Sequence, residues 1–366
     1  MLLLTNQDIE AVLDMKTSLA ALEIGYRDLV RNDATYRPRS DLVVTSAPTD
    51  TFPDAHFRFG SMEGACSTLG TYAIRLKSDV SHTLNGRLQK YCLQPGTYYG
   101  IVLLFSLYDA APLAIMHDGF IQHMRVGATG GLGAKYLARA DASVVGIIGA
   151  GGMARTNLWA FSELFSIELV KVYSPTKANR ERFAHEMSEQ FGLRVESCER
   201  PEDVMRGSHI VATCTDSASH VITDPQWLEP GMHLTDNTPG EWAPAVVRRC
   251  GVKARLAWSS VQSPEPGTRR IGGENVYAAG QRAALSRLAT ARPEEPEGVG
   301  TWPHLKDIMA GRYAGRTSPE DISFFNNHGS QGLQFAAVGQ MAYTLAKEAG
   351  LGRELPIEWF VEDVRN

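Results

Sequence analysis

The segment that most constrains the fold lies in the middle of the chain, at residues 144–155. An apolar, β-branched run at 144–148 leads into a glycine-rich turn and then into a stretch of helical composition. This is the strand–turn–helix context that the dinucleotide fingerprint requires. Gly149 permits the tight turn, Gly151 lets the backbone approach a pyrophosphate, and Ala154 permits close packing of the helix on the strand. The residues that we predict to bind a dinucleotide here are Gly149, Ala150, Gly151, Gly152, Met153 and Ala154.

Size and composition indicate a globular protein of about two domains. The chain has 366 residues, of which 43% are hydrophobic and 21% charged, enough for a sizeable core. The formal net charge of −5 gives no reason to expect a nucleic-acid partner. No apolar run approaches the roughly 18 residues of a membrane-spanning helix, so we expect no membrane partner.

The cysteines and the N-terminal residues favour a cytoplasmic protein. The five cysteines are scattered, without a CxxC or a Cys/His spacing, at Cys66, Cys92, Cys198, Cys214 and Cys250. Such a set is typical of reduced thiols in the cytosol, and we expect no metal site. Residues 1–8 lack the basic start and the cleavage site of a signal peptide, so we predict a short strand and a capped helix there.

Hydrophobic periodicity predicts a different organisation before and after the glycine-rich turn. Before it, we expect helices at 5–31 and 120–139, and strands at 41–45, 71–77, 100–107 and 112–116. After it, we expect helices at 154–164 and 177–191, a short helix from Val204, and strands at 169–173, 193–196, 209–213, around Leu234 and at 256–258. Strands that alternate with helices predict a parallel sheet. A final helix is predicted at 331–349.

Residues 263–303 are rich in Pro, Gly, Glu and Arg. We expect a long loop in this segment, with part of it serving as a lid over the substrate. If so, deletion of residues 264–279 raises the KM for substrate and leaves cofactor affinity nearly unchanged.

Several short motifs, spread over most of the chain, resemble the ornithine cyclodeaminase/μ-crystallin family. In addition to the glycine-rich turn, the motifs are GTYAIRL at 70–76, QHMRVGA at 122–128, AKYLAR at 134–139, YSPT at 173–176, CTDS at 214–217, PGMH at 230–233 and GRTS at 315–318. Members of that family include cyclodeaminases, ketimine reductases, alanine dehydrogenases and related imino-acid reductases.

The resemblance implies an α/β homodimer built from two kinds of domain. One is a Rossmann-type dinucleotide-binding domain, which we expect at 126–324. The other is an α+β domain for substrate binding and dimerisation, which we expect at 1–125 plus 325–366.

Two positions depart from the family's pattern. Where the family has its catalytic Lys on a strand, this chain has Arg75, with Lys77 two residues later. Where cyclodeaminases have an Asp after the Pro-Gly-x-His turn, no acid falls in register, and Asp236 and Glu241 are the nearest acids. Both changes weaken a strict cyclodeaminase assignment and leave hydride transfer intact, and we retain Asp236 as a catalytic candidate.

The resemblance also implies which residues bind the substrate. Arg125 matches the family's carboxylate anchor, and a planar guanidinium can bind a carboxylate through two parallel hydrogen bonds. Arg39 matches the second anchor, with Arg37 as its rival, and a solvated loop arginine is the alternative for either. Met62 matches a substrate-pocket position, for which a plain core methionine is the alternative.

Arg75 and Lys77 alternate with apolar residues, so strand geometry places both cations on one face. A cation beside an imine or keto group stabilises the negative charge that develops there. A lysine can also donate a proton when burial lowers its pKa, whereas an arginine stays protonated. We therefore predict Lys77 as the general acid and Arg75 as its electrostatic partner. A cation pair on a solvated face is the alternative, and His328 is a weaker candidate acid or base.

The strand predicted at 169–173 ends without the acid that binds the ribose 2′-hydroxyl in NAD enzymes. Ser174, Thr176 and Lys177 follow instead, with Arg180 one turn further on. These side chains can hold a 2′-phosphate, so we predict NADP(H) in preference to NAD(H), with solvated helix charges as the alternative. The cofactor-binding residues that the resemblance adds are Cys214, Thr215 and Asp216.

The sequence thus predicts an NAD(P)H-dependent oxidoreductase that acts on the C=N, C–N or C=O bond of a small imino acid, keto acid or amino acid. Its expected partner is a small-molecule carboxylate. One alternative is a cyclodeaminase-like lyase that releases ammonia with no net cofactor turnover. A second is a protein that binds NADPH and a ligand without catalysis.

Overall fold

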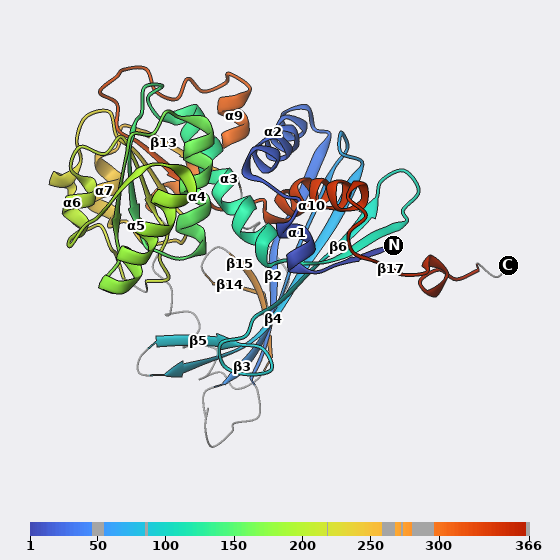
Figure 1. The fold of residues 1–366 in the computed structure, drawn as a ribbon. Coiled ribbons are helices and arrows are strands. Elements are labelled where there is room, and N and C mark those ends of the chain that lie inside the picture. The colour runs from blue at the N-terminus through green and yellow to red at the C-terminus, as the bar shows by residue number, and fades with distance from the viewer. Residues whose placement is uncertain are drawn as a thin grey trace.

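The computed structural model of the chain describes residues 1–45, 55–84, 87–217, 219–257, 268–271, 274–279 and 296–363. The molecule contains two sheets that lie side by side, with helices between and around them (Figure 1). One sheet is mixed and the other is entirely parallel. The predicted α/β class, a Rossmann-type sheet with a second α+β domain, is confirmed.

The mixed sheet comprises ten strands within the described ranges, in the order β14-β15-β2-β3-β4-β6-β7-β1-β17, with β5 paired to β4. Its strands are β1 (Leu2–Leu4), β2 (Ala34–Thr45), β3 (His56–Cys66), β4 (Thr71–Leu84), β5 (Arg87–Tyr91), β6 (Tyr99–Ser106), β7 (Pro112–His117), β14 (Thr268–Ile271), β15 (Glu274–Ala279) and β17 (Arg353–Glu354). Neighbouring antiparallel strands alternate buried and less buried residues, as in β3, so one face packs on helices.

Three helices, α1 (Asn6–Glu10), α2 (Met15–Arg31) and α10 (Gln331–Glu348), lie beside this sheet (Figure 1). The continuous helix predicted at 5–31 is wrong, because the chain forms two helices with separate N-caps. Thr5 caps α1 through the amide of Asp8, and Asp14 caps α2 through the amide of Thr17 at 2.7 Å. A new cap in mid-segment satisfies the free amides of a helix start and sets its direction.

The parallel sheet comprises seven strands, counted over the described part of the chain, in the order β10-β9-β8-β11-β12-β16-β13. They are β8 (Val144–Ile148), β9 (Leu169–Tyr173), β10 (Arg194–Ser197), β11 (Ile210–Thr213), β12 (His233–Asp236), β13 (Val252–Arg255) and β16 (Ser323–Asn326). The helices of this domain are α4 (Gly152–Leu164), α5 (Lys177–Phe191), α6 (Pro201–Met205), α7 (Pro244–Arg249) and α9 (Leu305–Met309). The strand predicted at 256–258 is wrong at residues 256–257, because β13 already ends at Arg255, and residue 258 lies outside the described residues.

Helix α3 (Gly119–Leu137) joins the two sheets and is buried along most of its length. Glycines let it approach its neighbours closely. A Cβ on Gly127 would overlap the backbone of Thr156 in α4, and one on Gly133 would overlap the ring of Phe325 in β16. This close packing fixes α3 against the parallel sheet, and its N-terminal turn reaches the mixed sheet. No helix within the described ranges is long and apolar enough to cross a membrane.

The long loop predicted at 263–303 is corrected in part. Strands β14 and β15 form an antiparallel pair within it, and β15 pairs in parallel with β2 of the mixed sheet. These strands are short and β15 pairs with a strand far away in the sequence, so the overall Pro and Gly content of the segment gave no sign of them. Much of the proposed lid, including residues 264–267, 272–273 and 280–295, lies outside the described residues.

Candidate active site

Two cations on β4 begin the candidate site. Arg75 and Lys77 are both buried, 5% and 6% exposed, which excludes the alternative of a solvated cation pair. In the register of the sheet, Met62 of β3 is opposite Arg75 and Gly60 is opposite Lys77. The Sδ atom of Met62 lies 3.8 Å from Nη1 of Arg75. Met62 therefore lies in the same layer as the strand cations.

Arg75 is paired with Asp118, the residue that precedes α3. Nε of Arg75 donates to Oδ2 of Asp118 at 2.7 Å, and Nη2 donates to the same oxygen. Asp118 occupies the space above Gly100, where any Cβ would overlap its carboxylate. Gly100 is in turn the register partner of Lys77. Asp118 was not identified from the sequence. Gly100 was the available signal, because a glycine within a strand indicates that another group approaches the backbone closely.

Lys77 has a carboxylate partner on its own strand. Its Nζ donates to Oδ2 of Asp79 at 2.7 Å, and Ser81 donates to the other oxygen of Asp79 at 2.7 Å. Burial, with the positive charge of Arg39 as the next cause, lowers the pKa of Lys77 to about 7, although Asp79 opposes the change. Lys77 is thus poised to exchange a proton near neutral pH, as a general acid must.

Arg125 of α3 is buried, and its hydrogen-bond partners among the described residues are two neutral amides. Nη1 donates to Oε1 of Gln334 at 2.8 Å, and Nη2 donates to Oε1 of Gln122 at 2.8 Å. Among the described residues, its buried Nε has no hydrogen-bond partner. Burial and the nearby charge of Arg75 lower the pKa of Arg125 to about 9. Neither glutamine was identified from the sequence.

Gln334 connects Arg125 to the helices behind it. Its Nε2 donates to the carbonyl of Gly329 at 2.8 Å and to the hydroxyl of Tyr26 at 3.2 Å. The ring of Phe335 lies against both guanidinium groups, 5.5 Å from Arg75 and 5.2 Å from Arg125. Cation–π contacts of this kind hold the two arginines over one aromatic ring.

The structure separates Arg39 from its rival Arg37. The side chain of Arg39 is 11% exposed, and its Nε donates to Oδ1 of Asp41 at 3.0 Å. Arg58 binds the other oxygen of that carboxylate from Nε at 3.0 Å. The side chain of Arg37 is 59% exposed and pairs with Glu63. Of the two rivals, Arg39 rather than Arg37 therefore lies in the buried polar layer with Lys77.

Asp236 lies at the end of β12, 1% exposed, beside the last residues of β16. Its Oδ1 accepts a hydrogen bond from the amide of Asn327 at 3.0 Å and lies 3.3 Å from Nε2 of His328. Asn327 also donates to the carbonyl of Val126 in α3 at 3.3 Å. Asp236 and His328 thus lie at the edge of the parallel sheet that faces the Arg125 helix.

The glycine-rich turn has the geometry expected of a dinucleotide cradle. Gly149 has φ +114°, and a Cβ there would overlap the carbonyl of Cys214. Around the Cβ position of Gly151 there is open space within 4 Å, and Gly151 is the N-cap of α4. Gly152 instead packs on the ring of His123 from α3. Open space at a helix N-terminus with free amides suits a pyrophosphate.

The residues after β9 carry positive charge without an acid at the strand end. Ser174 is buried, and its carbonyl accepts a hydrogen bond from Nη1 of Arg180 at 3.1 Å. Thr176 is the N-cap of α5 without a side-chain cap bond. Lys177 is exposed and lies 3.6 Å from Glu181. The Arg180 guanidinium therefore lies at the end of β9, whereas Lys177 lies beside an acid of its own helix.

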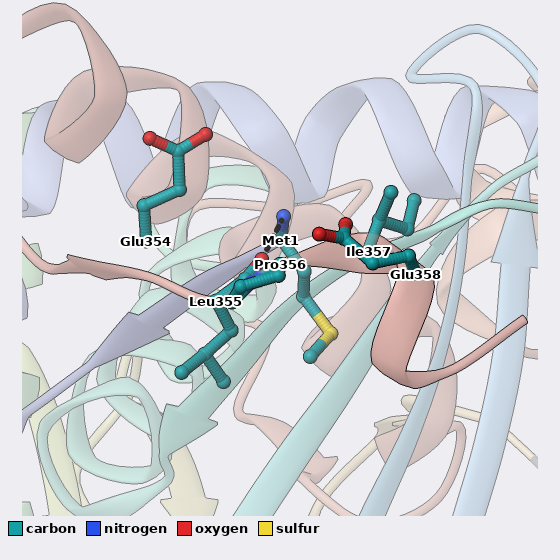
Figure 2. A pocket seen from close by; sticks show the side chains of 6 residues that line it. All are labelled: Met1, Glu354, Leu355, Pro356, Ile357 and Glu358. Atoms are coloured by element: carbon teal, nitrogen blue, oxygen red, sulfur yellow. Dashed lines mark hydrogen bonds between the residues drawn. The ribbon is translucent and has the colours of Figure 1, made fainter.

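A hollow of about 450 Å³ lies away from these residues, beside the ends of β1 and β17 (Figure 2). It is lined by Met1, Glu354, Leu355, Pro356, Ile357 and Glu358. The amino group of Met1 donates to the carbonyl of Leu355 at 3.2 Å. None of the lining residues belongs to the predicted site, so this hollow is not part of it.

The fold, the buried cations around Arg125 and the glycine-rich turn together define a class of protein. It is a two-domain α/β protein with a parallel, Rossmann-like sheet and a mixed-sheet domain. Residues 81–344 match the model of the ornithine cyclodeaminase/mu-crystallin family. The chain belongs to that family, and the resemblance in the sequence motifs is confirmed.

Three relatives illustrate the range of the family. The chain is 28% identical over 263 residues to an uncharacterized cyclodeaminase from Sinorhizobium fredii, which covers 70% of this chain and 73% of the relative. It is 26% identical over 357 residues to alanine dehydrogenase from Archaeoglobus fulgidus, with 97% and 98% covered. The solved Δ1-pyrroline-2-carboxylate reductase of Thermococcus litoralis, in complex with NADH and L-proline, is 25% identical with a TM-score of 0.74, covering 97% of this chain and 100% of that one.

Proposed function

We propose that this protein is an NAD(P)H-dependent oxidoreductase that acts on the C=N, C–N or C=O bond of a small imino acid, keto acid or amino acid. The observation that carries the proposal is the state of Arg125. Its guanidinium is buried against two neutral amides, and no described carboxylate pairs with it. A buried cation without a counter-ion is costly unless an anion binds, so the site favours a substrate carboxylate.

The residues around Arg125 then have separate tasks. Arg125, with Arg39 as the second cation, holds the carboxylate. Arg75 and Lys77 lie beside the reacting carbon and polarise its C=N or C=O bond. Lys77 donates a proton to the nitrogen or oxygen as the bond is reduced, and Asp79 holds its ammonium group in place.

A dinucleotide fits the opposite side of this site. The open space at Gly151 and the amides at the start of α4 would hold its pyrophosphate. Thr215 and Asp216 follow the neighbouring strand β11 at the same edge of the sheet. When bound, the nicotinamide supplies or accepts the hydride. Asp236, at the end of β12, orders the segment at 326–328 on which this edge depends.

We further propose that the cofactor is NADP(H) rather than NAD(H). Support comes from the sequence after β9, where Ser174, Thr176, Lys177 and Arg180 follow the strand and no acid is present at 174–177, and from the contact of Arg180 with the carbonyl of Ser174. A carboxylate at this position would bind a 2′-hydroxyl and repel a 2′-phosphate. The relative from Thermococcus litoralis was solved with NADH, so the proposed preference differs from the cofactor in that structure, and binding of NADPH and NADH to this chain tests it.

We also propose a cytoplasmic homodimer. All five cysteines are free thiols, as a reducing compartment requires. On β2 and β3, Leu42, Val44 and Phe57 are 52%, 46% and 38% exposed, while Val43, between the first two, is buried on the other face. An exposed apolar face on the sheet of the substrate domain is suited to a second copy of this chain, which light scattering would detect.

The deciding experiment is a set of absorbance measurements at 340 nm with NADPH and, separately, NADH. The substrates are pyruvate, glyoxylate, oxaloacetate and 2-oxoglutarate with ammonia or methylamine, and the cyclic imino acids pyrroline- and piperideine-2-carboxylate. Falling absorbance with a new amine, identified by mass spectrometry, supports the reductase. Constant absorbance, with proline or pipecolate formed from ornithine or lysine, supports the cyclodeaminase. Dinucleotide binding without any product supports the non-catalytic alternative.

A further inference from the structure

Glu241 is a fully buried carboxylate that none of the steps above uses. It receives three hydrogen bonds from the end of β11 and the loop after it: the Thr213 hydroxyl at 2.9 Å, the Thr215 amide at 2.6 Å and the Thr215 hydroxyl at 2.8 Å. It receives two more from the loop after β12, from the amides of Asn237 at 3.2 Å and Thr238 at 3.0 Å. Both oxygens therefore accept hydrogen bonds. Oε1 accepts from Thr215 alone, whereas Oε2 accepts from Thr213 and from the loop after β12.

The same two loops are connected by further bonds. The Thr238 hydroxyl donates to the carbonyl of Thr215 at 3.0 Å, and Nδ2 of Asn237 donates to the carbonyl of Thr213 at 2.9 Å. Oδ1 of Asn237 accepts a hydrogen bond from Nδ2 of Asn327 at 3.1 Å. Glu241 thus lies at the centre of a network that extends from β11 to the segment beside Asp236.

The topology explains why this network matters for a dinucleotide. From β8 the chain continues to β9 and β10 on one side, whereas β11 and β12 lie on the other. In open α/β sheets, ligands bind at the carboxyl ends of the strands, in the crevice where the order reverses. That crevice opens between β8 and β11, where the carbonyl of Cys214 packs against Gly149. The loop that Glu241 holds is therefore one wall of the predicted cofactor crevice.

Glu241 can do this only as an acceptor. Each hydrogen bond that its carboxylate makes with the described residues comes from an N–H or O–H donor, and an ionised carboxylate accepts on both oxygens. Burial raises the pKa of Glu241, while the amide and hydroxyl of Thr215 oppose that change. An amide in its place would direct its own N–H groups at donors on one of the two loops and leave them unsatisfied.

We propose that Glu241 is a positioning residue for the cofactor. Its carboxylate fixes the loops at 214–217 and 237–240 in the arrangement that receives the dinucleotide, without touching the dinucleotide itself. The inference rests on the proposed function, since it assumes that the crevice binds NAD(P)H. The complete use of both oxygens also removes Glu241 from the role of the missing cyclodeaminase Asp, for which it was one of the two nearby acids.

The test compares Glu241→Gln with Glu229→Gln. Glu229 also accepts a backbone hydrogen bond, from the amide of Gly207 at 3.1 Å, but it lies before β12, at the opposite edge of the same sheet. We expect Glu241→Gln to raise the Kd for NADH and for NADPH at least tenfold, measured by quenching of tryptophan fluorescence. Glu229→Gln should change each Kd by less than twofold. Melting temperatures of both variants separate loss of folded protein from loss of affinity.

If folded Glu241→Gln binds both dinucleotides as tightly as Glu229→Gln, the inference is wrong. If wild-type protein binds neither dinucleotide, the proposed function fails, which is a distinct result. Should Glu241→Gln not fold, Thr213→Val removes one of the five donors. It should raise both Kd values two- to fivefold, and an unchanged Kd would equally overturn the role of Glu241. A purely structural role predicts lower melting temperatures with unchanged affinity.

Discussion

Arg75 and Asp118 form a buried ion pair in which Nε and Nη2 of the guanidinium both donate to Oδ2 of the carboxylate. Arg125 lies over the same Phe335 ring as Arg75, with neutral amides as partners. The two arginines therefore differ in their hydrogen-bond partners, although both are buried. Arg75 is paired with a carboxylate, whereas Arg125 has neutral partners, and the proposed function assigns the charge of Arg125 to a ligand.

Replacement of Arg125 should therefore weaken transition-state binding. We expect Arg125→Ala to lower kcat/KM at least about tenfold, which corresponds to roughly 1.4 kcal/mol of lost transition-state stabilisation. Arg125→Lys keeps the charge without the planar pair of donors and should retain part of the activity. Steady-state kinetics on the best substrate measure both values. An unchanged kcat/KM for the alanine variant would remove Arg125 from the site.

The pH profile should show the titration of Lys77. Its pKa of about 7 means that the proton-donating form is lost as the pH rises, so the rate of the reductive reaction should fall through about pH 7. Lys77→Met should lower kcat at least about 100-fold, the usual range for loss of a general acid. Lys77→Arg keeps the charge and should abolish the fall in rate near pH 7, which is the limb of the pH profile assigned to Lys77. A limb that persists in Lys77→Arg would assign the titration to another group.

Gly149 and Gly151 should respond differently to alanine. Gly149→Ala combines a left-handed φ of +114° with overlap against Cys214, so it should lower both the melting temperature and cofactor binding. Gly151→Ala meets open space, so its melting temperature should stay near that of the wild type. Its Cβ would nevertheless occupy the space assigned to the pyrophosphate, and dinucleotide Kd should rise at least about tenfold, in line with the need for close backbone approach. Equal affinity in Gly151→Ala would contradict the predicted cradle.

The proposed preference for NADPH should weaken when Lys177 is replaced by an acid. Lys177→Glu should raise the Kd for NADPH about threefold or more, the size expected of an exposed charge pair, and should leave the Kd for NADH unchanged. Lys347→Glu, at an exposed position near the end of α10, is the matched control for a change in net charge. Tighter binding of NADH than of NADPH by the wild-type protein would show that the preference is wrong.

The stability of the protein should fall in acid because of His233. Burial lowers the pKa of His233 to about 3, so the folded protein keeps it neutral while the unfolded chain protonates it below about pH 6.5. The free energy of unfolding should therefore decrease as the pH falls from about 6.5 toward 3, by up to about 1.4 kcal/mol per pH unit. His233→Asn should flatten this slope in urea unfolding series. His185→Gln, at an exposed position of α5, should leave the slope as it is.

The sequence by itself determined the elements whose signals are local. Strand β9 and helix α5 have the predicted bounds. The turn at Gly149 and Gly151 also lies where it was predicted, because periodicity and backbone freedom depend on neighbouring residues. Alternation along β4 likewise placed Arg75 and Lys77 on one face, and the motifs identified the family. The sequence could not reveal the break in the helix predicted at 5–31 or the strands within 263–303.

The tertiary structure decided what depends on residues far apart in the chain. It paired Arg75 with Asp118 over Gly100, gave Arg125 its neutral partner Gln334, 209 positions away, and separated buried Arg39 from exposed Arg37. It also converted Glu241, one acid in a polar segment, into the acceptor for two loops. Charge balance and burial are set by such distant neighbours, and the proposed roles of Arg125 and Glu241 depend on them.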